Sequence, residues 1–140
     1  MKWTIDNGSM PYYIRVETDG DASSESIVAM WDELIQSDSW SPGLTVLIDN
    51  RKLKQLKDGE AITNACIDYF AENKDRIGKA CISTVSDHPE NFKFARQFQY
   101  GTRLKGSDVV LQLFTSESQA LRWLDHYSKL QPDEFHTVSA

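Results

Sequence analysis

The stretch Val46-Leu47-Ile48-Asp49-Asn50-Arg51 decides the fold of this chain. An apolar run that begins at Leu44 ends in an acid, and a base follows two residues later. A parallel strand that is buried on both faces has this continuous aliphatic character, and it delivers polar side chains at its carboxyl end. We therefore predict a central strand over 44–48 and a functional site at the edge of the sheet where that strand ends.

Composition is typical of a single globular domain. The chain has 140 residues, of which 40% are hydrophobic, and this suffices for a core. Its net charge of −6 argues against a nucleic-acid binder, which normally presents a basic face. No apolar run approaches the roughly 20 residues that cross a bilayer, and residues 1–6 have no signal-peptide core. We expect a cytoplasmic protein without a transmembrane segment, in which Cys66 and Cys81 are reduced core residues.

Outward from the central strand, strand and helix patterns alternate. We predict strands over 2–6, 12–18, 44–48, 80–85 and 109–114, with the second antiparallel to the first after a turn at 7–11. Helices are predicted to begin at Ser23 or Ser24, Asp58, Asp87 and Ser116. A basic loop is expected over 50–57, and a loose tail over 131–140 follows one domain of residues 1–130.

The order β-β-α-β-α-β-α-β-α requires crossover connections, so the predicted fold class is α/β. The sheet should be a single layer of five strands, mixed but mainly parallel, covered by four helices. The third of these helices has a clear predicted start: Asp87 as its cap, Pro89 in the first turn and Glu90 placed for a capping box. The second helix should end just before Gly78.

Three local patterns resemble the SpoIIAA-like family, within the STAS and SEC14-like group of small α/β domains. The first is the stretch 46–51, which is similar to the family's strand ending in Asp. The second is Ser86-Asp87 followed by Phe94-Ala95-Arg96-Gln97-Phe98, and the third is the closing segment 113–124, with Phe114 followed by an acid and then Ala-Leu-Arg-Trp-Leu. The resemblance covers most of residues 12–127 and implies a fold more firmly than an activity.

The chain departs from the related anti-sigma-factor antagonists at one position. Those proteins are switched by phosphorylation of a Ser just after the strand-terminal Asp, whereas here no hydroxyl follows Asp49 before Thr63, inside the next predicted helix. A phosphorylation switch at that place is therefore not expected. A lipid pocket of the SEC14 type is not expected either, because such domains are larger and line their cavity with additional apolar helices.

Charged residues at two strand ends are the candidate site. Asp49 and Arg51 could form an ion pair or orient a ligand, or Asp49 could only shape the turn. Arg51, Lys52, Lys54 and Lys57 could bind a phosphate or an acidic partner, although Asp58 and Glu60 occupy the adjacent helix start, which favours a solvated loop.

Asp87 and His88 follow the next strand and could share a cleft with Asp49 for acid–base work, but the capping role of Asp87 explains the pair as well. Arg96 could face the same cleft or lie on the surface. Cys81 and His88 are about 20 Å apart along an extended chain, which argues against a nucleophile and base. The cysteines and histidines show no metal-ligand spacing.

The aromatic residues of the helix after His88 are expected to pack in the core, with one exception. Phe92 and Phe94 point about 200° apart on a helix, so one of them should be exposed. Together with Tyr100 it would mark a contact patch.

The family resemblance, together with the absence of a complete catalytic constellation, implies a non-enzymatic, bacterial-type regulatory or protein-interaction domain that binds a protein partner or a second copy of itself. The contact would involve Asp49, Arg51, Lys52, Lys54, Asp87, His88 and Arg96. The alternative is a small-molecule or lipid-head-group binder at the carboxyl edge, with Arg51 and Arg96 as contacts for an anionic ligand. An enzyme that uses Asp49 or Asp87 with His88 is a third hypothesis, which requires Asp49 and His88 to lie together. We expect no cofactor, metal or nucleic acid.

Overall fold

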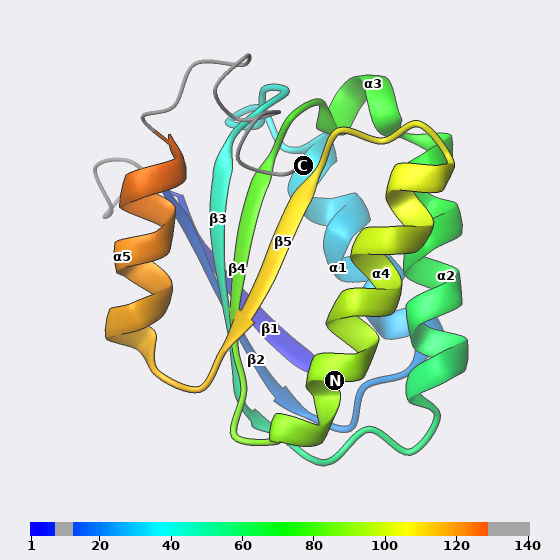
Figure 1. Ribbon diagram of the computed structural model, residues 1–140, viewed down its shortest axis with the longest axis vertical. Helices are drawn as coiled ribbons and strands as arrows, with labels where there is room; N and C mark the ends of the chain where they lie inside the picture. Colours follow the sequence, from blue (N-terminus) through cyan, green and yellow to red (C-terminus); the bar gives the residue numbers. More distant parts are fainter. Residues whose placement is uncertain (8–12, 129–140) are drawn as a thin grey trace.

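The computed structural model describes residues 1–7 and 13–128, which form one five-stranded sheet with helices on both faces (Figure 1). The strands are β1 (Lys2–Asp6), β2 (Ile14–Gly20), β3 (Thr45–Leu53), β4 (Cys81–Val85) and β5 (Val110–Phe114), and they lie side by side in chain order. β1 is antiparallel to β2, and the other neighbours are parallel. The predicted mixed, mainly parallel sheet is confirmed. The turn at 8–11 and the tail at 131–140 lie outside the described residues.

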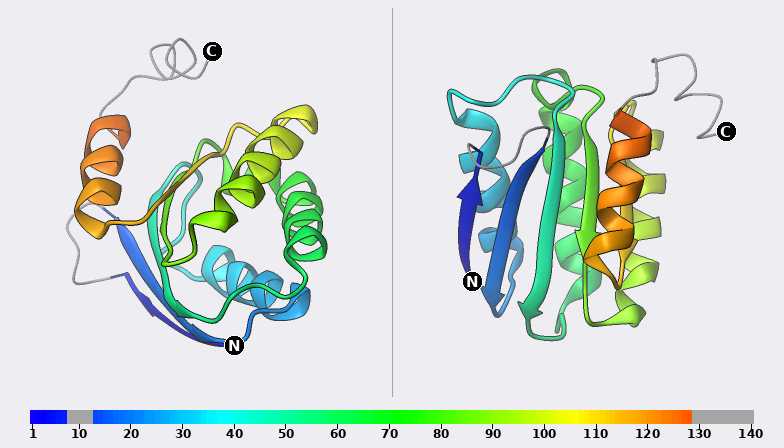
Figure 2. Two further views of the ribbon diagram at one scale, coloured as in Figure 1. Left: turned by 60° about the horizontal axis from the view of Figure 1, so that its bottom comes forward. Right: turned by 90° about the vertical axis from the view of Figure 1, so that its left-hand side faces the viewer.

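Four helices cover this sheet unequally. α1 (Ser24–Gln36), α2 (Gly59–Glu72) and α4 (Phe92–Leu104) lie on one face, and α5 (Glu117–Ser128) lies on the other (Figure 2). A one-turn helix, α3 (Lys74–Ile77), follows α2. The single helix predicted up to Gly78 is thus interrupted at Asn73, whose side-chain Nδ2 and backbone N–H both donate to the carbonyl of Tyr69. An Asn side chain competes in this way for the backbone groups that continue a helix.

The predicted helix starts agree with the structure in part. Ser23 caps α1, and it exchanges hydrogen bonds with Ser26 in a capping box. Ser116 Oγ accepts the backbone N–H of Gln119 at the start of α5, at 3.4 Å. Asp58 occupies the cap position of α2 but makes no capping bond with its side chain.

The capping role predicted for Asp87 is wrong. The chain first forms a short 3-10 turn, η1 (Pro89–Asn91), and α4 begins only at Phe92, with no side-chain cap on either element. Ser86 Oγ accepts the backbone N–H of His88 at 3.0 Å, so the serine at the strand end organises this connection while Asp87 stays exposed.

Two strands run further than their sequence patterns indicate. β3 continues to Leu53 through residues predicted as a loop, and β2 continues to Gly20. The extensions stabilise each other, because Asp19 pairs with Lys52 and Gly20 with Leu53 after an irregularity at 17–19. The β3–β4 ladder, in contrast, ends at the pair Asp49–Val85. Asp49 therefore lies within β3, at the point where its neighbour β4 ends.

The core is divided between the two faces by the alternation along β3. Val46 and Ile48 pack toward α1, α2 and α4 in the larger cluster, whereas Leu47 packs toward α5 with Ala120 and Leu124. The three helices of the larger face meet through their aromatic rings. Trp31 and Phe70, and Phe70 and Phe98, contact edge to face with centroids 4.9 Å apart.

Candidate functional site

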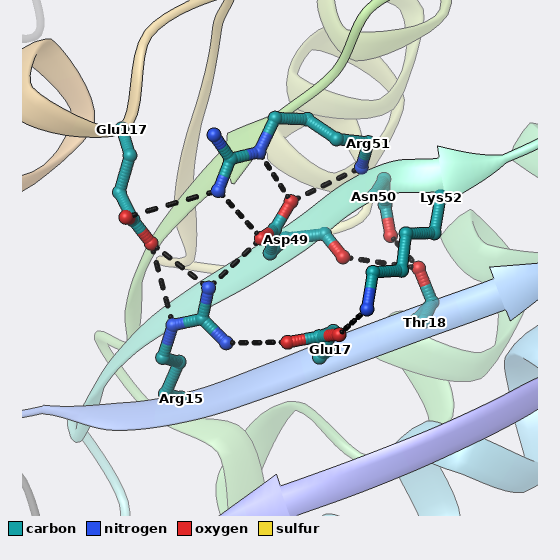
Figure 3. A network of polar contacts seen from close by, with 8 residues as sticks. All are labelled: Arg15, Glu17, Thr18, Asp49, Asn50, Arg51, Lys52 and Glu117. Carbon is teal, nitrogen blue, oxygen red and sulfur yellow. Dashed lines mark hydrogen bonds and ion pairs between the residues drawn. The ribbon is translucent and has the colours of Figure 1, made fainter.

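A network of ion pairs surrounds Asp49 on the face covered by α5 (Figure 3). The Asp49 side chain is 8% exposed. Arg51 donates from Nε to Oδ1 at 2.9 Å and from Nη2 to Oδ2 at 2.8 Å, and its backbone N–H also donates to Oδ1. Arg15 on β2 donates from Nη2 to Oδ2 at 2.8 Å. These hydrogen bonds and charges, led by the Arg51 side chain, lower the pKa of Asp49 from 3.8 to about 2 despite its burial.

Glu117 extends the network from α5 to the sheet. Its carboxylate accepts from Arg15 Nη2 at 2.9 Å and lies 3.7 Å from Arg51 Nη2. Glu17 lies 3.0 Å from Arg15 and accepts from Lys52 at 2.6 Å. The negative charges of three carboxylates thus neutralise the positive charges of two arginines and one lysine. The arrangement is a bridge between α5, β2 and β3, and its guanidinium groups are already occupied by carboxylates.

The remaining predicted site residues are dispersed around the carboxyl edge. Lys54 lies 3.7 Å from Asp21, and Arg96 is exposed on α4. Asp87 is exposed as well, and its charge contributes to the raised pKa of Arg51, which arises first from the hydrogen bond to Asp49. The structure therefore brings Asp49, Arg51 and Lys52 into one network and leaves Lys54, Asp87 and Arg96 outside its hydrogen bonds.

Asp49 and His88 lie on opposite faces of the sheet. Asp49 points toward α5 with Arg15 and Glu117, whereas His88 lines a cavity on the α1, α2 and α4 face. The acid–base pairing of these two residues is therefore not formed. Cys66 and Cys81 are free thiols, and burial raises the pKa of each to about 12, so neither is a ready nucleophile at neutral pH.

The cavity that His88 lines is a concave feature of the larger helical face. It has a volume of about 140 Å³ and lies between the carboxyl half of the sheet and α1, α2 and α4. Its wall is mostly apolar and includes Met30, Trp31, Ile48, Ile62, Phe98 and Leu113. A mostly apolar cavity with few polar groups is typical of small-molecule sites, and the edge beyond the carboxyl ends of the strands is where α/β sheets place them.

Some of the residues that line the cavity are polar. Ser86 and Asn91, which flank the turn into α4, both line it. The Asn91 Oδ1 atom is buried and has no hydrogen-bond partner among the described residues. Asn50 also lines the cavity, and its Oδ1 accepts from Thr18 at 2.6 Å. A buried acceptor without a hydrogen bond destabilises a folded protein and is uncommon, so Asn91 is an unusual residue at this position.

The ion-pair network and the cavity lie at the same edge of the sheet but on opposite faces. Ile48 and Asn50 alternate with Asp49 and Arg51 along β3, so these four residues separate into the cavity on one side and the ion-pair network on the other. The alternation of side chains along a strand was the feature of the sequence that indicated this separation. Asn91 has no comparable signal in the sequence, because it reaches the cavity from the irregular 3-10 turn before α4.

Two negative findings concern the described residues. Within residues 1–7 and 13–128, no group of three or more His, Cys, Asp and Glu side chains is placed to hold a metal ion. In the same part of the chain, none of the helices has both the length and the apolar character needed to cross a membrane.

Comparison with known proteins identifies the fold. The sequence matches no protein-family model and no curated protein. Among solved structures, the chain is similar to an uncharacterised protein of the DUF3478 family from Shewanella loihica, which is described as having a SpoIIAA-like fold. The superposition has a TM-score of 0.55 at 13% identity, and it covers 88% of this chain and 92% of that chain. The chain therefore has a SpoIIAA-like fold, as the sequence resemblance implied. At this identity the likeness extends to the fold alone.

Proposed function

We propose that this chain is a non-enzymatic domain that binds a small, mostly apolar molecule in the cavity between the sheet and α1, α2 and α4. The observation that carries the proposal is the coincidence of an apolar cavity of about 140 Å³ with the carboxyl edge of the sheet. The wall supports it, since aromatic and aliphatic side chains such as Trp31, Ile62 and Phe98 make up most of the cavity surface.

The ion-pair network has a structural role in this proposal. Its carboxylates and guanidinium groups satisfy one another, so an anionic ligand at Arg51 would have to compete with Asp49 and Glu117. A ligand that binds through apolar contacts in the cavity, on the other face of the sheet, does not compete with these carboxylates. The small-molecule function expected as the alternative from the sequence is therefore favoured, with its site on the opposite face from Asp49 and without Arg51 and Arg96 as contacts.

A matched pair of alanine substitutions tests the proposal. Ala95 on α4 lines the cavity, whereas Ala65 on α2 is comparably half-buried but lines a separate surface groove. Toluene and phenol are the probes, and the readout is the shift in Tm of the unliganded protein. We expect at least one probe to raise Tm of the wild-type protein and of Ala65→Leu but not of Ala95→Leu, whose larger side chain fills the cavity. If neither probe stabilises the wild type, or if Ala95→Leu responds equally, the proposal is wrong.

A protein-interaction role is the second candidate, and one observation favours it. Tyr100 and Leu104 on α4 are 68% and 70% exposed, and they are the exposed large hydrophobic side chains among the described residues. They lie one helical turn apart on the same side of α4. This apolar surface differs from the edge at 49–57 and 87–96 predicted from the sequence. Sedimentation equilibrium of the wild type and of Leu104→Ser is the test of self-association, and a strictly monomeric wild type at high concentration would exclude the homodimer.

A further inference from the structure

We infer that the surface formed by α2 and α4 pairs with the same surface of a second copy of this chain, so that α2 of each copy lies on α4 of the other. The inference rests on the second candidate function, to which it adds the partner and its orientation, and it is independent of the cavity. Three features of this surface support it: exposed apolar side chains, opposite charges on the two helices, and the alignment of those charges along the helices.

Exposed apolar side chains border a shallow groove between α2 and α4. Tyr100 and Leu104 are exposed, and both line this groove together with Gly101. The two helices approach closely at that point, because a Cβ atom at position 101 would lie 2.5 Å from the Ile67 side chain. The glycine therefore leaves a recess beside Tyr100 and Leu104, into which an apolar side chain of a second copy can pack.

The two helices carry opposite charges. α2 has three acidic residues and no Lys or Arg, so its net charge is −3, whereas α4 has three basic residues and no Asp or Glu, so its net charge is +3. All of these side chains are exposed: Glu60, Asp68, Glu72, Lys93, Arg96 and Arg103. A copy of this surface is complementary to it when α2 faces α4, because α2 on α2 and α4 on α4 would bring like charges together.

α2 and α4 are parallel and in a defined register. They run side by side in the same direction (Figure 1). Gln97 on α4 donates to Asn64 on α2 at 3.1 Å, and Lys105 at the end of α4 donates to Asp68 at 2.7 Å. The paired residues are 33 and 37 positions apart in the chain. A residue of α2 therefore lies at the height of the α4 residue that follows it by about this number of positions.

This register aligns acids with bases. Glu60 lies at the height of Arg96, and Asp68 lies at the height of Arg103. A two-fold axis parallel to the helices places α2 of one copy on α4 of the other and leaves every height unchanged. Each acid then faces an arginine of the second copy. Tyr100 follows Arg96 by four residues and precedes Arg103 by three, so it lies on the same side of α4, between the two arginines.

The size of the surface predicts a weak dimer. A helix of 13 or 14 residues is about 20 Å long, and packed helices lie about 10 Å apart. Two such helices cover about 400 Å² on each copy, or about 800 Å² in total, which is at the low end for transient complexes. We therefore expect a dimer that is populated at protein concentrations near 1 mM and dissociates on dilution.

A pair of charge-reversal variants tests the arrangement. Glu60→Lys/Asp68→Lys changes the net charge of α2 from −3 to +1, and Arg96→Glu/Arg103→Glu changes that of α4 from +3 to −1. We expect sedimentation equilibrium at about 0.15 M salt to give a Kd at least about tenfold higher for either variant alone. In an equal mixture, every helix again faces a helix of opposite charge, so we expect a mixed dimer with a Kd close to that of the wild type.

A control and a variant-free measurement accompany this test. Arg122→Glu is the control, because Arg122 is exposed on α5, which covers the opposite face of the sheet, and it should leave the Kd unchanged. The Asp68–Lys105 pair is exposed, so its loss in one variant should disturb the fold little. Concentration-dependent amide chemical shifts of the wild-type protein require no variant, and they should fall on α2 and α4 and not on α5.

The outcomes separate this inference from the functions proposed above. A wild-type protein that stays monomeric near 1 mM overturns the inference and excludes the homodimer, and the binding function of the cavity is unaffected. If the wild type dimerises but both variants keep its Kd, or if the chemical shifts fall elsewhere, self-association stands and its assignment to α2 and α4 is wrong. If both variants weaken the dimer but fail to pair with each other, the placement of α2 on α4 is overturned.

Discussion

Arg15 on β2 donates a hydrogen bond from Nη2 to Oδ2 of Asp49 on β3, across 2.8 Å, and the two residues belong to neighbouring parallel strands. The same Arg15 Nη2 atom also donates to Glu117 of α5 at 2.9 Å. Asp49 is therefore the buried centre of a charge network that joins two strands to the helix covering them. Removal of a buried ionic partner is costly mainly because it leaves the opposite charge without compensation.

Substitution of Asp49 by Asn should destabilise the fold strongly. Arg51 would lose both of its carboxylate contacts on Asp49, and Arg15 would keep only Glu17 and Glu117. We expect a loss of about 2–4 kcal/mol in the free energy of unfolding, measured by urea denaturation. Lys52→Gln is the control, because its exposed pair with Glu17 should contribute less than about 1 kcal/mol. Equal effects of the two substitutions would contradict the central position of Asp49.

Low pH should remove the contribution of Asp49 to the stability of the wild-type protein. The folded-state pKa of Asp49, about 2, lies below its ordinary value of 3.8, so the unfolded chain binds a proton more readily than the folded chain. The stabilisation is complete above about pH 4 and declines toward pH 2 as Asp49 becomes protonated in the folded state. We expect the stability difference between the wild type and Asp49→Asn to shrink by about 2 kcal/mol over that window. A difference that stays constant from pH 6 to about pH 2 would show that Asp49 is not ionised in the network.

Substitution of Ser83 by Ala, unlike substitution of Asp49, should not destabilise the fold. Its Oγ is buried between β4 and α5 and has no hydrogen-bond partner among the described residues. Ser83→Ala removes an unpaired polar group, so we expect an unchanged stability or a gain of up to about 1 kcal/mol. Ser107→Ala is the matched control, since Ser107 is similarly buried but accepts the backbone N–H of Val109. That variant should lose about 1 kcal/mol. Thermal denaturation of the two variants distinguishes them, and a destabilised Ser83→Ala would reveal a partner for the hydroxyl.

The fold could be predicted from the sequence because its elements have regular periods. The aliphatic run at 44–48, the stripe of Trp31, Leu34 and Ile35, and the alternation of Ile14 and Val16 each follow from burial on a known face. The ends of the elements depend on tertiary contacts. β3 continues to Leu53 because β2 supplies a partner for residues whose sequence predicts a solvated loop. A one-dimensional pattern does not contain that pairing.

The sequence points to the carboxyl edge of the sheet, where both the ion-pair network and the cavity lie, but not to the residues that form the cavity wall. Asp49 and Arg51 stand out in the sequence as charges after an apolar run, yet each satisfies the other. The cavity is built from residues of α1, α2, α4 and three strands that are ordinary core residues when they are considered singly. The missing hydrogen-bond partner of Asn91 Oδ1 among the described residues is likewise a property that exists only in three dimensions.

The wall of the cavity depends on close contact between Gly59, at the start of α2, and Phe94 on α4. A Cβ atom at position 59 would lie 2.3 Å from the Phe94 ring, which lines the cavity. Gly59→Ala should therefore displace the ring, and we expect it to destabilise the fold by about 1–3 kcal/mol and to weaken binding of toluene and phenol. The double variant Gly59→Ala/Phe94→Leu tests the cause. Relief of the clash predicts that the double variant loses less stability than the sum of the two single variants, as measured by urea denaturation. Strictly additive losses would mean that the substitution at Gly59 acts through something other than Phe94, and the contact would then not shape the cavity.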